Sequence, residues 1–213
     1  MNENVQKVID LRVEKTIRAL EKNNMQGYYV KSRGELFSLI DELTASDKLI
    51  TSGGSATLSE VGVIAHLNEK YGDIFADRSK CATPEETEEC FRKAFISDTY
   101  FASSNAITED GELYNVDGTG NRVSAMIFGP KQVIIVAGIN KIVHDKAEAE
   151  QRVEKIAAPA NAIRLCQETP CAKTGECAHC HSPQRICCSY VRLGQQRKKD
   201  RIKVIFINES LGF

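Results

Sequence analysis

The stretch Val133-Ile134-Ile135-Val136-Ala137 is entirely apolar, and its length and β-branched content are typical of a buried strand. Residues 203–207 (Lys-Val-Ile-Phe-Ile) have the same character, and shorter strand candidates lie at 28–30, 48–51, 74–76 and 99–102. Between them run segments with helical spacing of apolar residues or helix-start signals, at 4–22, 33–44, 56–67, 84–96, 118–128 and 145–157. Strands that alternate with helices predict a mostly parallel sheet with helices on both faces.

Asp110-Gly111 is a strong turn signal between two short strands, which predicts an antiparallel pair and makes the expected sheet mixed. The predicted fold class is therefore α/β, with an open, mixed, mostly parallel sheet. We expect one domain over 1–213, with an N-terminal helix within 1–27. A cysteine-rich segment at 166–188 interrupts the chain before the last strand.

Composition excludes several function classes. The chain has 213 residues, of which 42% are hydrophobic and 27% charged, as in an ordinary folded protein. The net charge is −1, so neither nucleic acid nor an anionic membrane is an expected partner. We find no apolar run long enough to span a bilayer and no signal-peptide pattern at the N-terminus, which predicts a cytoplasmic protein.

A glycine loop follows the second strand candidate, with the sequence Ser52-Gly53-Gly54-Ser55-Ala56-Thr57. Glycines allow a tight turn and close approach of a ligand. Free amides at the start of the next helix, together with the Ser55 and Thr57 hydroxyls, suit a phosphate or carboxylate. The alternative is an ordinary turn with serine or threonine as the helix cap. The spacing matches neither a Walker A loop nor the dinucleotide fingerprint.

Polar residues are dense over 103–122, close to expected strand ends, where α/β sheets bind ligands. A carboxylate there can act as nucleophile or base, and an arginine can clamp an anion. The alternative is a solvated hairpin whose polar side chains satisfy turn backbone. The candidate ligand-binding residues of the loop and this stretch are Gly53, Gly54, Ser55, Thr57, Asn105, Asp117, Asn121 and Arg122.

Three motifs in this region resemble one family. They are Tyr100-Phe101-Ala102-Ser103-Ser104-Asn105-Ala106-Ile107, Asn115-Val116-Asp117-Gly118-Thr119-Gly120-Asn121-Arg122, and Phe128-Gly129-Pro130 before the 133–138 strand. With Asp110-Gly111-Glu112-Leu113 between them, they look like the lactate-utilisation (LUD) domain family. The resemblance covers about 30–213 and is most specific over 100–143.

The resemblance implies a fold similar to that of glucosamine-phosphate deaminases, ribose-phosphate isomerases and CoA transferases. It also implies a small anionic metabolite as ligand and iron–sulfur oxidoreductase subunits as partners, because family members occur in operons for oxidising L-lactate to pyruvate. The CoA-transferase branch uses a glutamate in a Ser-Glu-Asn-Gly turn as nucleophile. Thr108-Glu109-Asp110-Gly111 is similar to that turn, although two of its four residues differ, so Glu109 is the candidate catalytic residue.

Six of the eight cysteines fall within 166–188, spaced C-x4-C-x5-C-x2-C-x6-C-C. The cysteines at 177 and 180 form a C-x2-C pair, a spacing that allows two thiolates to coordinate one metal ion. The surrounding residues resemble a C-terminal segment of some LUD-domain proteins. By that resemblance the metal ligands are Cys171, Cys177, Cys180 and Cys187, with Cys166 and Cys188 as spare thiols.

Four thiolates suit zinc or an iron–sulfur cluster, and the redox biology of the family favours the cluster. Two alternatives stay open, a structural zinc site without catalytic function and a segment of free thiols without metal. His179 or His181 can replace a thiolate as ligand. We find no flavin or nicotinamide fingerprint.

Three functions follow from these observations. The first is a part in lactate or related organic-acid utilisation, with a cysteine-bound metal or cluster. The second is a CoA-transferase or phosphosugar-type enzyme that uses Glu109. The third is a non-catalytic metal- or redox-sensing module. An exposed N-terminal helix also makes a homo-oligomer an open expectation.

Overall fold

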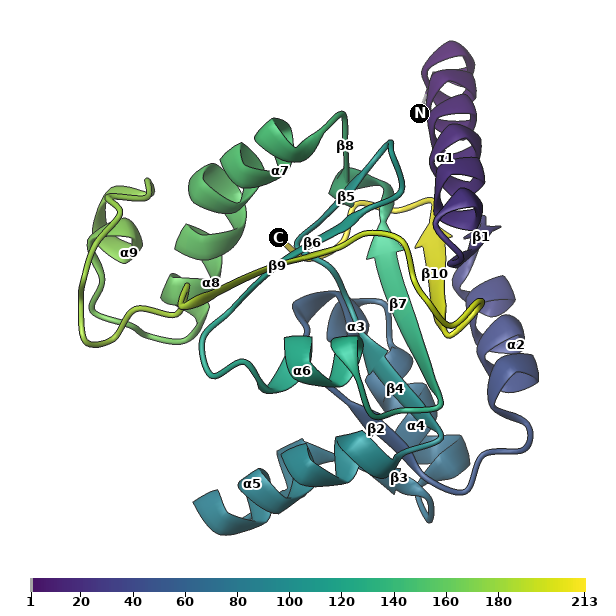
Figure 1. Ribbon diagram of the computed structural model, residues 1–213, viewed down its shortest axis with the longest axis horizontal. Coiled ribbons are helices and arrows are strands. Elements are labelled where there is room, and N and C mark those ends of the chain that lie inside the picture. Colours follow the sequence, from purple (N-terminus) through teal and green to yellow (C-terminus); the bar gives the residue numbers. More distant parts are fainter. Residues whose placement is uncertain (1) are drawn as a thin grey trace.

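The computed structural model describes residues 2–213 and contains a six-stranded sheet in which every neighbouring pair is parallel (Figure 1). Its strand order is β1-β10-β7-β4-β2-β3. The strands are β1 (Gln26–Val30), β2 (Ile50–Ser52), β3 (Phe75–Ala76), β4 (Thr99–Ala102), β7 (Gln132–Gly138) and β10 (Ile202–Ile207). The α/β class and the mostly parallel sheet expected from the sequence are confirmed.

Successive side chains of the central strand β7 enter two different cores. Val133 and Ile135 belong to one buried cluster, whereas Ile134 and Val136 belong to the other. A strand needs this continuous apolar sequence when both faces of its sheet are covered, since alternate side chains point to opposite faces.

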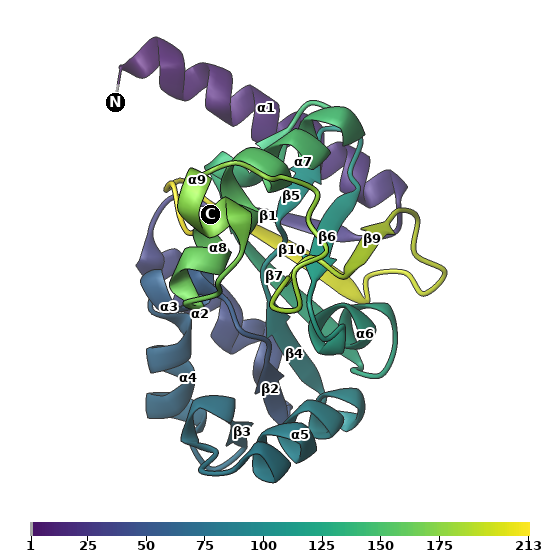
Figure 2. The same ribbon diagram turned by 90° about the vertical axis from the view of Figure 1, so that its left-hand side faces the viewer.

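One face of the sheet is covered by three helices, whose apolar residues pack in one core with the strands. These helices are α2 (Arg33–Thr44), α3 (Ala56–Glu60) and α4 (Val63–Tyr71). The other face is covered by α1 (Glu3–Lys22), α6 (Asn121–Ile127) and a second sheet. Figures 1 and 2 show these layers from two directions.

The second sheet has the order β8-β5-β6-β9. Its strands are β5 (Ala106–Thr108), β6 (Leu113–Asp117), β8 (Ile142–Val143) and β9 (Ser189–Leu193). The Asp110-Gly111 hairpin is present as predicted, but its strands belong to this sheet and not to the parallel one. Strand β9 was not predicted, because its side chains are only half-buried or exposed and it lacks an apolar run.

A long helical segment covers the outer side of the second sheet (Figure 1). It runs through α7 (Lys146–Arg152), a π-helical turn η4 (Val153–Ala157) and α8 (Ala158–Arg164). It therefore continues seven residues past the predicted end at 157, and brings Arg164 to the carboxyl edge of the parallel sheet.

The remaining described elements are short connections. They are η1 (Arg78–Lys80), α5 (Pro84–Lys93), η2 (Ala94–Ile96), η3 (Ile139–Lys141) and α9 (Pro170–Thr174). Over residues 2–213 no helix has the length and apolar content that crossing a membrane requires.

Helix α1 packs on the sheet through only part of its length. Val13 and Leu20 are buried, whereas Val5 and Val8 near its N-terminal end are exposed. In Figure 2 this end projects from the body of the molecule.

Candidate functional site

A cavity of about 250 Å³ lies where strands β2, β4 and β7 of the parallel sheet end, and we call it the site cavity. Loops that follow parallel strands meet at this edge, which is where open α/β sheets bind ligands. The lining residues are Gly54, Ser55, Ala56, Thr57, Arg78, Ser103, Ser104, Asn105, Val116, Asp117, Gly118, Thr119, Asn121, Arg122, Lys141, Asn161, Arg164, Leu165, Ile186 and Phe213.

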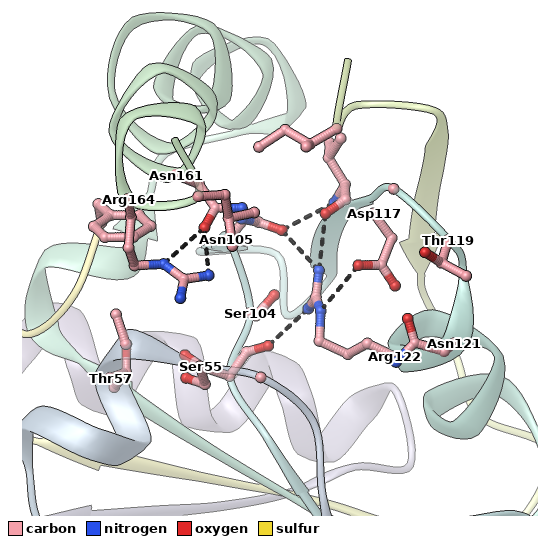
Figure 3. A pocket seen from close by; sticks show the side chains of 18 of the residues that line it. Ser55, Thr57, Ser104, Asn105, Asp117, Thr119, Asn121, Arg122, Asn161 and Arg164 are labelled. Atoms are coloured by element: carbon pink, nitrogen blue, oxygen red, sulfur yellow. Dashed lines mark hydrogen bonds and ion pairs between the residues drawn. The ribbon is translucent and has the colours of Figure 1, made fainter. Parts of the chain in front are cut away.

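The site cavity thus brings the predicted glycine loop and the predicted polar stretch together, although about 50 residues separate them in the chain. Seven of the eight candidate ligand-binding residues line it, and only Gly53 does not. Figure 3 shows Ser55 and Thr57 on one side of the space, and Asn105, Asp117 and Arg122 on another.

The glycine loop packs closely against its neighbours. A Cβ atom on Gly53 would lie 2.5 Å from the Tyr100 hydroxyl, and one on Gly54 would lie 3.0 to 3.1 Å from the Arg78 guanidinium. The Ser55 hydroxyl accepts a hydrogen bond from the Leu58 amide (3.2 Å) and caps α3. The cap interpretation therefore holds for Ser55, while Gly54 allows Arg78 to approach the cavity.

Arg122 joins several residues of the cavity wall through hydrogen bonds of its guanidinium. One terminal nitrogen donates to the Ser103 carbonyl (2.9 Å) and to Asn115 Oδ1 (2.8 Å). The other donates to Asn105 Oδ1 (3.1 Å) and to the Val116 carbonyl (2.9 Å). Its Nε lies 3.6 Å from Asp117 Oδ1. These partners occupy the guanidinium, so Arg122 shapes the cavity and has little capacity left to clamp an anion.

Asn105 and Asp117 of the polar stretch also bind the protein itself, since their side chains accept hydrogen bonds from backbone amides. Asn105 Oδ1 also accepts from the Val116 amide (2.9 Å), and Asp117 Oδ2 accepts from the Val123 amide at the start of α6 (3.1 Å). These two predicted residues therefore hold the connections between β4, β5, β6 and α6 in place.

Two arginines that the sequence analysis did not single out reach the site cavity. Arg78 is exposed, and its guanidinium lies 5.6 Å from the centre of the Phe91 ring. Arg164 is exposed and donates from Nε (3.0 Å) and one terminal nitrogen (2.7 Å) to Asn161 Oδ1 (Figure 3). Among the lining residues that the structure describes, Asp117 has the one acidic side chain. The cavity is therefore cationic.

Lys141 also lines the cavity and was not predicted. It is 2% exposed, and its Nζ donates a hydrogen bond to the Phe213 carbonyl. Burial, followed by the positive charges of Arg152 and Arg122, lowers the pKa of Lys141 to about 7, and Glu60 opposes the shift. Near neutral pH a substantial fraction of this amine therefore carries no proton.

Ser103 adds an unused polar group. The residue is 8% exposed and lines the cavity. Within residues 2–213 its hydroxyl has no hydrogen-bond partner. A buried polar group without a partner costs stability, so this hydroxyl is one that a bound ligand would satisfy.

The chain matches the LUD domain over residues 13–207. It belongs to the LUD domain family. A crystal structure of a DUF162 family protein from Deinococcus radiodurans is similar to this LUD domain protein, with a TM-score of 0.52 and 12% sequence identity. The similarity covers 95% of this chain and 98% of that one, and at this identity it shows the fold alone. No curated protein matches.

Glu109 does not line the site cavity of this LUD domain protein. It lies in the β5–β6 turn, where its carboxylate binds Arg12 Nε (2.6 Å) and Lys15 Nζ (2.7 Å) of α1. Burial acts to raise the pKa of Glu109, but the hydrogen bonds from Lys15 and Arg12 outweigh it and hold the pKa below its usual value. The same turn approaches α1 so closely that a Cβ on Gly111 would lie 2.4 Å from Ala19 backbone. In this position Glu109 anchors α1.

All eight cysteines are free thiols, and those of the 166–188 segment are half-buried or exposed. The Arg185 guanidinium holds part of this segment, donating to the carbonyls of Cys180 and Cys187 (both 2.7 Å). Across residues 2–213, however, no three His, Cys, Asp or Glu side chains are gathered as a metal site requires. The four predicted ligand thiols have suitable donor chemistry but are not brought together here, so that ligand set stays a prediction.

Proposed function

We propose that this LUD domain protein binds a small organic-acid anion of the lactate class in the site cavity and takes part in the utilisation of that acid. The supporting observation is the convergence of Arg78 and Arg164, with the partly protonated Lys141, on one cavity whose single described acidic side chain, Asp117, already lies beside Arg122. Arginine binds carboxylates through charge-assisted hydrogen bonds, and cationic clefts concentrate anions.

The size of the cavity supports a small ligand. Pockets for drug-sized molecules measure roughly 300 to 1,000 Å³. At about 250 Å³ the site cavity suits a small metabolite rather than a nucleotide-sized one. The resemblance of residues 100–143 to lactate-utilisation proteins favours lactate and related acids within that class.

Binding can be measured directly by calorimetry and by thermal melting of the full chain. L-lactate, pyruvate and acetate serve as anionic probes, and lactamide serves as the uncharged control. A ligand at about 100 times its dissociation constant stabilises the native state by about 2.7 kcal/mol. We expect the acids to raise the melting temperature and lactamide to leave it unchanged.

A matched pair of variants locates the site. Arg164→Gln removes a charge that lines the cavity, whereas Arg18→Gln removes an exposed charge on α1. We expect the first to weaken acid binding at least tenfold and the second to leave it unchanged. Equal affinities in both variants would show that the acid binds elsewhere.

The cysteine segment supports a second proposal on its donor chemistry alone: Cys171, Cys177, Cys180 and Cys187 hold zinc or an iron–sulfur cluster. The segment has one short helix, α9, and few buried residues, so a metal is a physical means of giving it one shape. Metal analysis and visible absorbance of anaerobically purified protein test this proposal. Colourless protein with stoichiometric zinc rules out the cluster, and protein without zinc or iron rules out both.

A further inference from the structure

The side chain of Lys141 is placed as a nucleophile rather than as a surface cation. It follows β7 directly, in η3, and the residue before it, Asn140, is held by two neighbours. Asn140 exchanges hydrogen bonds with the Leu211 amide (3.1 Å) and carbonyl (3.2 Å), and the Asn140 carbonyl accepts from Arg152 Nε (3.1 Å). The amine itself donates to the Phe213 carbonyl, which holds it at the cavity wall at the carboxyl edge of the sheet.

The charges around this amine favour its neutral form. Arg152 on α7 and Arg122 on α6 repel a proton on Nζ, Glu60 on α3 attracts one, and burial is the strongest influence. Arg152 is itself buried, and its guanidinium donates to the Asn105 carbonyl (2.8 Å) and is fixed there. Amines that are desolvated and near other cations are the ones that form Schiff bases with carbonyl substrates.

Two chemical requirements therefore meet in one cavity. The arginines select a carboxylate, and a neutral amine reacts with a carbonyl carbon. We propose that Lys141 is a covalent anchor, which forms an imine with a small 2-oxo acid whose carboxylate is held by Arg78 and Arg164. This inference rests on the proposed binding of an organic-acid anion, and it narrows that class to acids with a carbonyl next to the carboxylate.

The step is balanced without an oxidant or reductant. The Nζ lone pair adds to the carbonyl carbon, the carbonyl oxygen takes up a proton and the nitrogen loses one, which gives a carbinolamine. Protonation of that hydroxyl and its departure as water leave the C=N bond. The unpartnered Ser103 hydroxyl lines the same cavity and is available to a polar atom of the ligand.

Reductive trapping tests the inference on the full chain. The protein is incubated with pyruvate and sodium cyanoborohydride, its intact mass is measured, and the modified peptide is sequenced. We expect one reduced pyruvate per chain on Lys141, with labelling that increases as pH rises through about 7. L-lactate, which has an acid group but no carbonyl, should leave no adduct and should compete with labelling.

Two variants serve as controls. Lys141→Met should abolish the adduct, whereas Lys146→Met, at an exposed lysine of α7, should not change it. The competition by L-lactate needs no variant, so the test stands even if Lys141→Met folds poorly. Labelling spread over many lysines, or unchanged in Lys141→Met, would overturn the covalent role.

Calorimetry separates this inference from the proposed function. If pyruvate binds and is not trapped at Lys141, the imine is wrong and the acid-binding function stands. If no acid binds, the proposed function fails and the imine fails with it.

Discussion

Arg122 and Arg185 are both arginines whose guanidinium groups bind backbone carbonyls, but they hold very different regions. Arg122 is buried and joins the loop after β4 to β6, with partners up to 19 residues away. Arg185 is half-buried and joins carbonyls no more than five residues away, all within the cysteine segment. Arg122 therefore joins separate elements around the site cavity, whereas Arg185 joins only residues of its own segment.

A conspicuous sequence pattern therefore does not by itself mark the place where the fold gathers side chains around a cavity. Six cysteines within 166–188 are the most visible chemical pattern in the chain, yet the described thiols are not gathered. The site cavity is lined by short runs and single residues that are spread between Gly54 and Phe213.

The largest effect is expected for Arg122→Met. It leaves the Ser103 carbonyl, Asn115 Oδ1 and Asp117 without their partner, and breaking one side of a buried charged network costs about 3 to 5 kcal/mol. Urea unfolding measures this loss in the free energy of unfolding. Arg185→Met should change it little, and an equal loss in both variants would show that the fold depends on the two arginines to the same degree.

Lys141→Met should alter how stability depends on pH. Below about pH 7 the folded and unfolded wild-type chains both carry the proton on Lys141, so burial of the charge lowers stability there. As pH rises from 7 towards 10.5 only the unfolded chain keeps the proton, so the wild type gains stability relative to the variant. Each unit of pKa difference is worth about 1.4 kcal/mol, so the full gain is a few kcal/mol. Parallel pH profiles of unfolding in the two proteins would refute this.

Glu109→Gln should cost about 1 kcal/mol, because it weakens the attachment of α1 through Arg12 and Lys15. The lowered pKa means that this contribution is present above the usual glutamate pKa and is lost as pH falls through the folded value. Unfolding at pH 7 and pH 4 measures it, with the exposed Glu14→Gln as control. Any CoA-transfer activity that survives Glu109→Gln unchanged rules out Glu109 as nucleophile.

The smallest effect on global unfolding is expected for metal removal. Because the cysteine segment has few contacts with the sheet, a chelator should increase proteolytic cleavage within 166–188 and leave the main urea transition in place. Limited proteolysis followed by mass spectrometry locates the cuts. A large shift of the main transition would show that the segment supports the whole fold.

The sequence predicts the layers of this fold well, because strands buried on both faces need apolar runs such as 133–137. The predicted bounds of α2 and β4 agree with the structure, at 33–44 and 99–102. Strand β9 was not predicted from the sequence, because it forms an edge of the second sheet and is only partly buried. The assignment of the hairpin to a separate sheet depends on packing against α1 and α7, which no local pattern records.

The candidate site was predicted in part. The clustering of glycines and polar residues in the sequence located the glycine loop and the 103–122 stretch. Nothing in the sequence indicates that these two segments meet in the fold. Lys141 and Arg164 are isolated charged residues at a strand end and a helix end, so their sequence context resembles that of solvated residues. What distinguishes Lys141 is its burial, which arises only when the chain near Phe213 packs over η3.

The position of β10 has a consequence for how the protein is made. This strand lies between β1 and β7, although the chain supplies it after every other strand of the parallel sheet. During synthesis β1 therefore has no partner in that sheet until residues 202–207 emerge from the ribosome. Non-local parallel pairing is slow and leaves apolar edges open to aggregation. Shortened translation products that lack these residues should consequently depend on chaperones or be degraded.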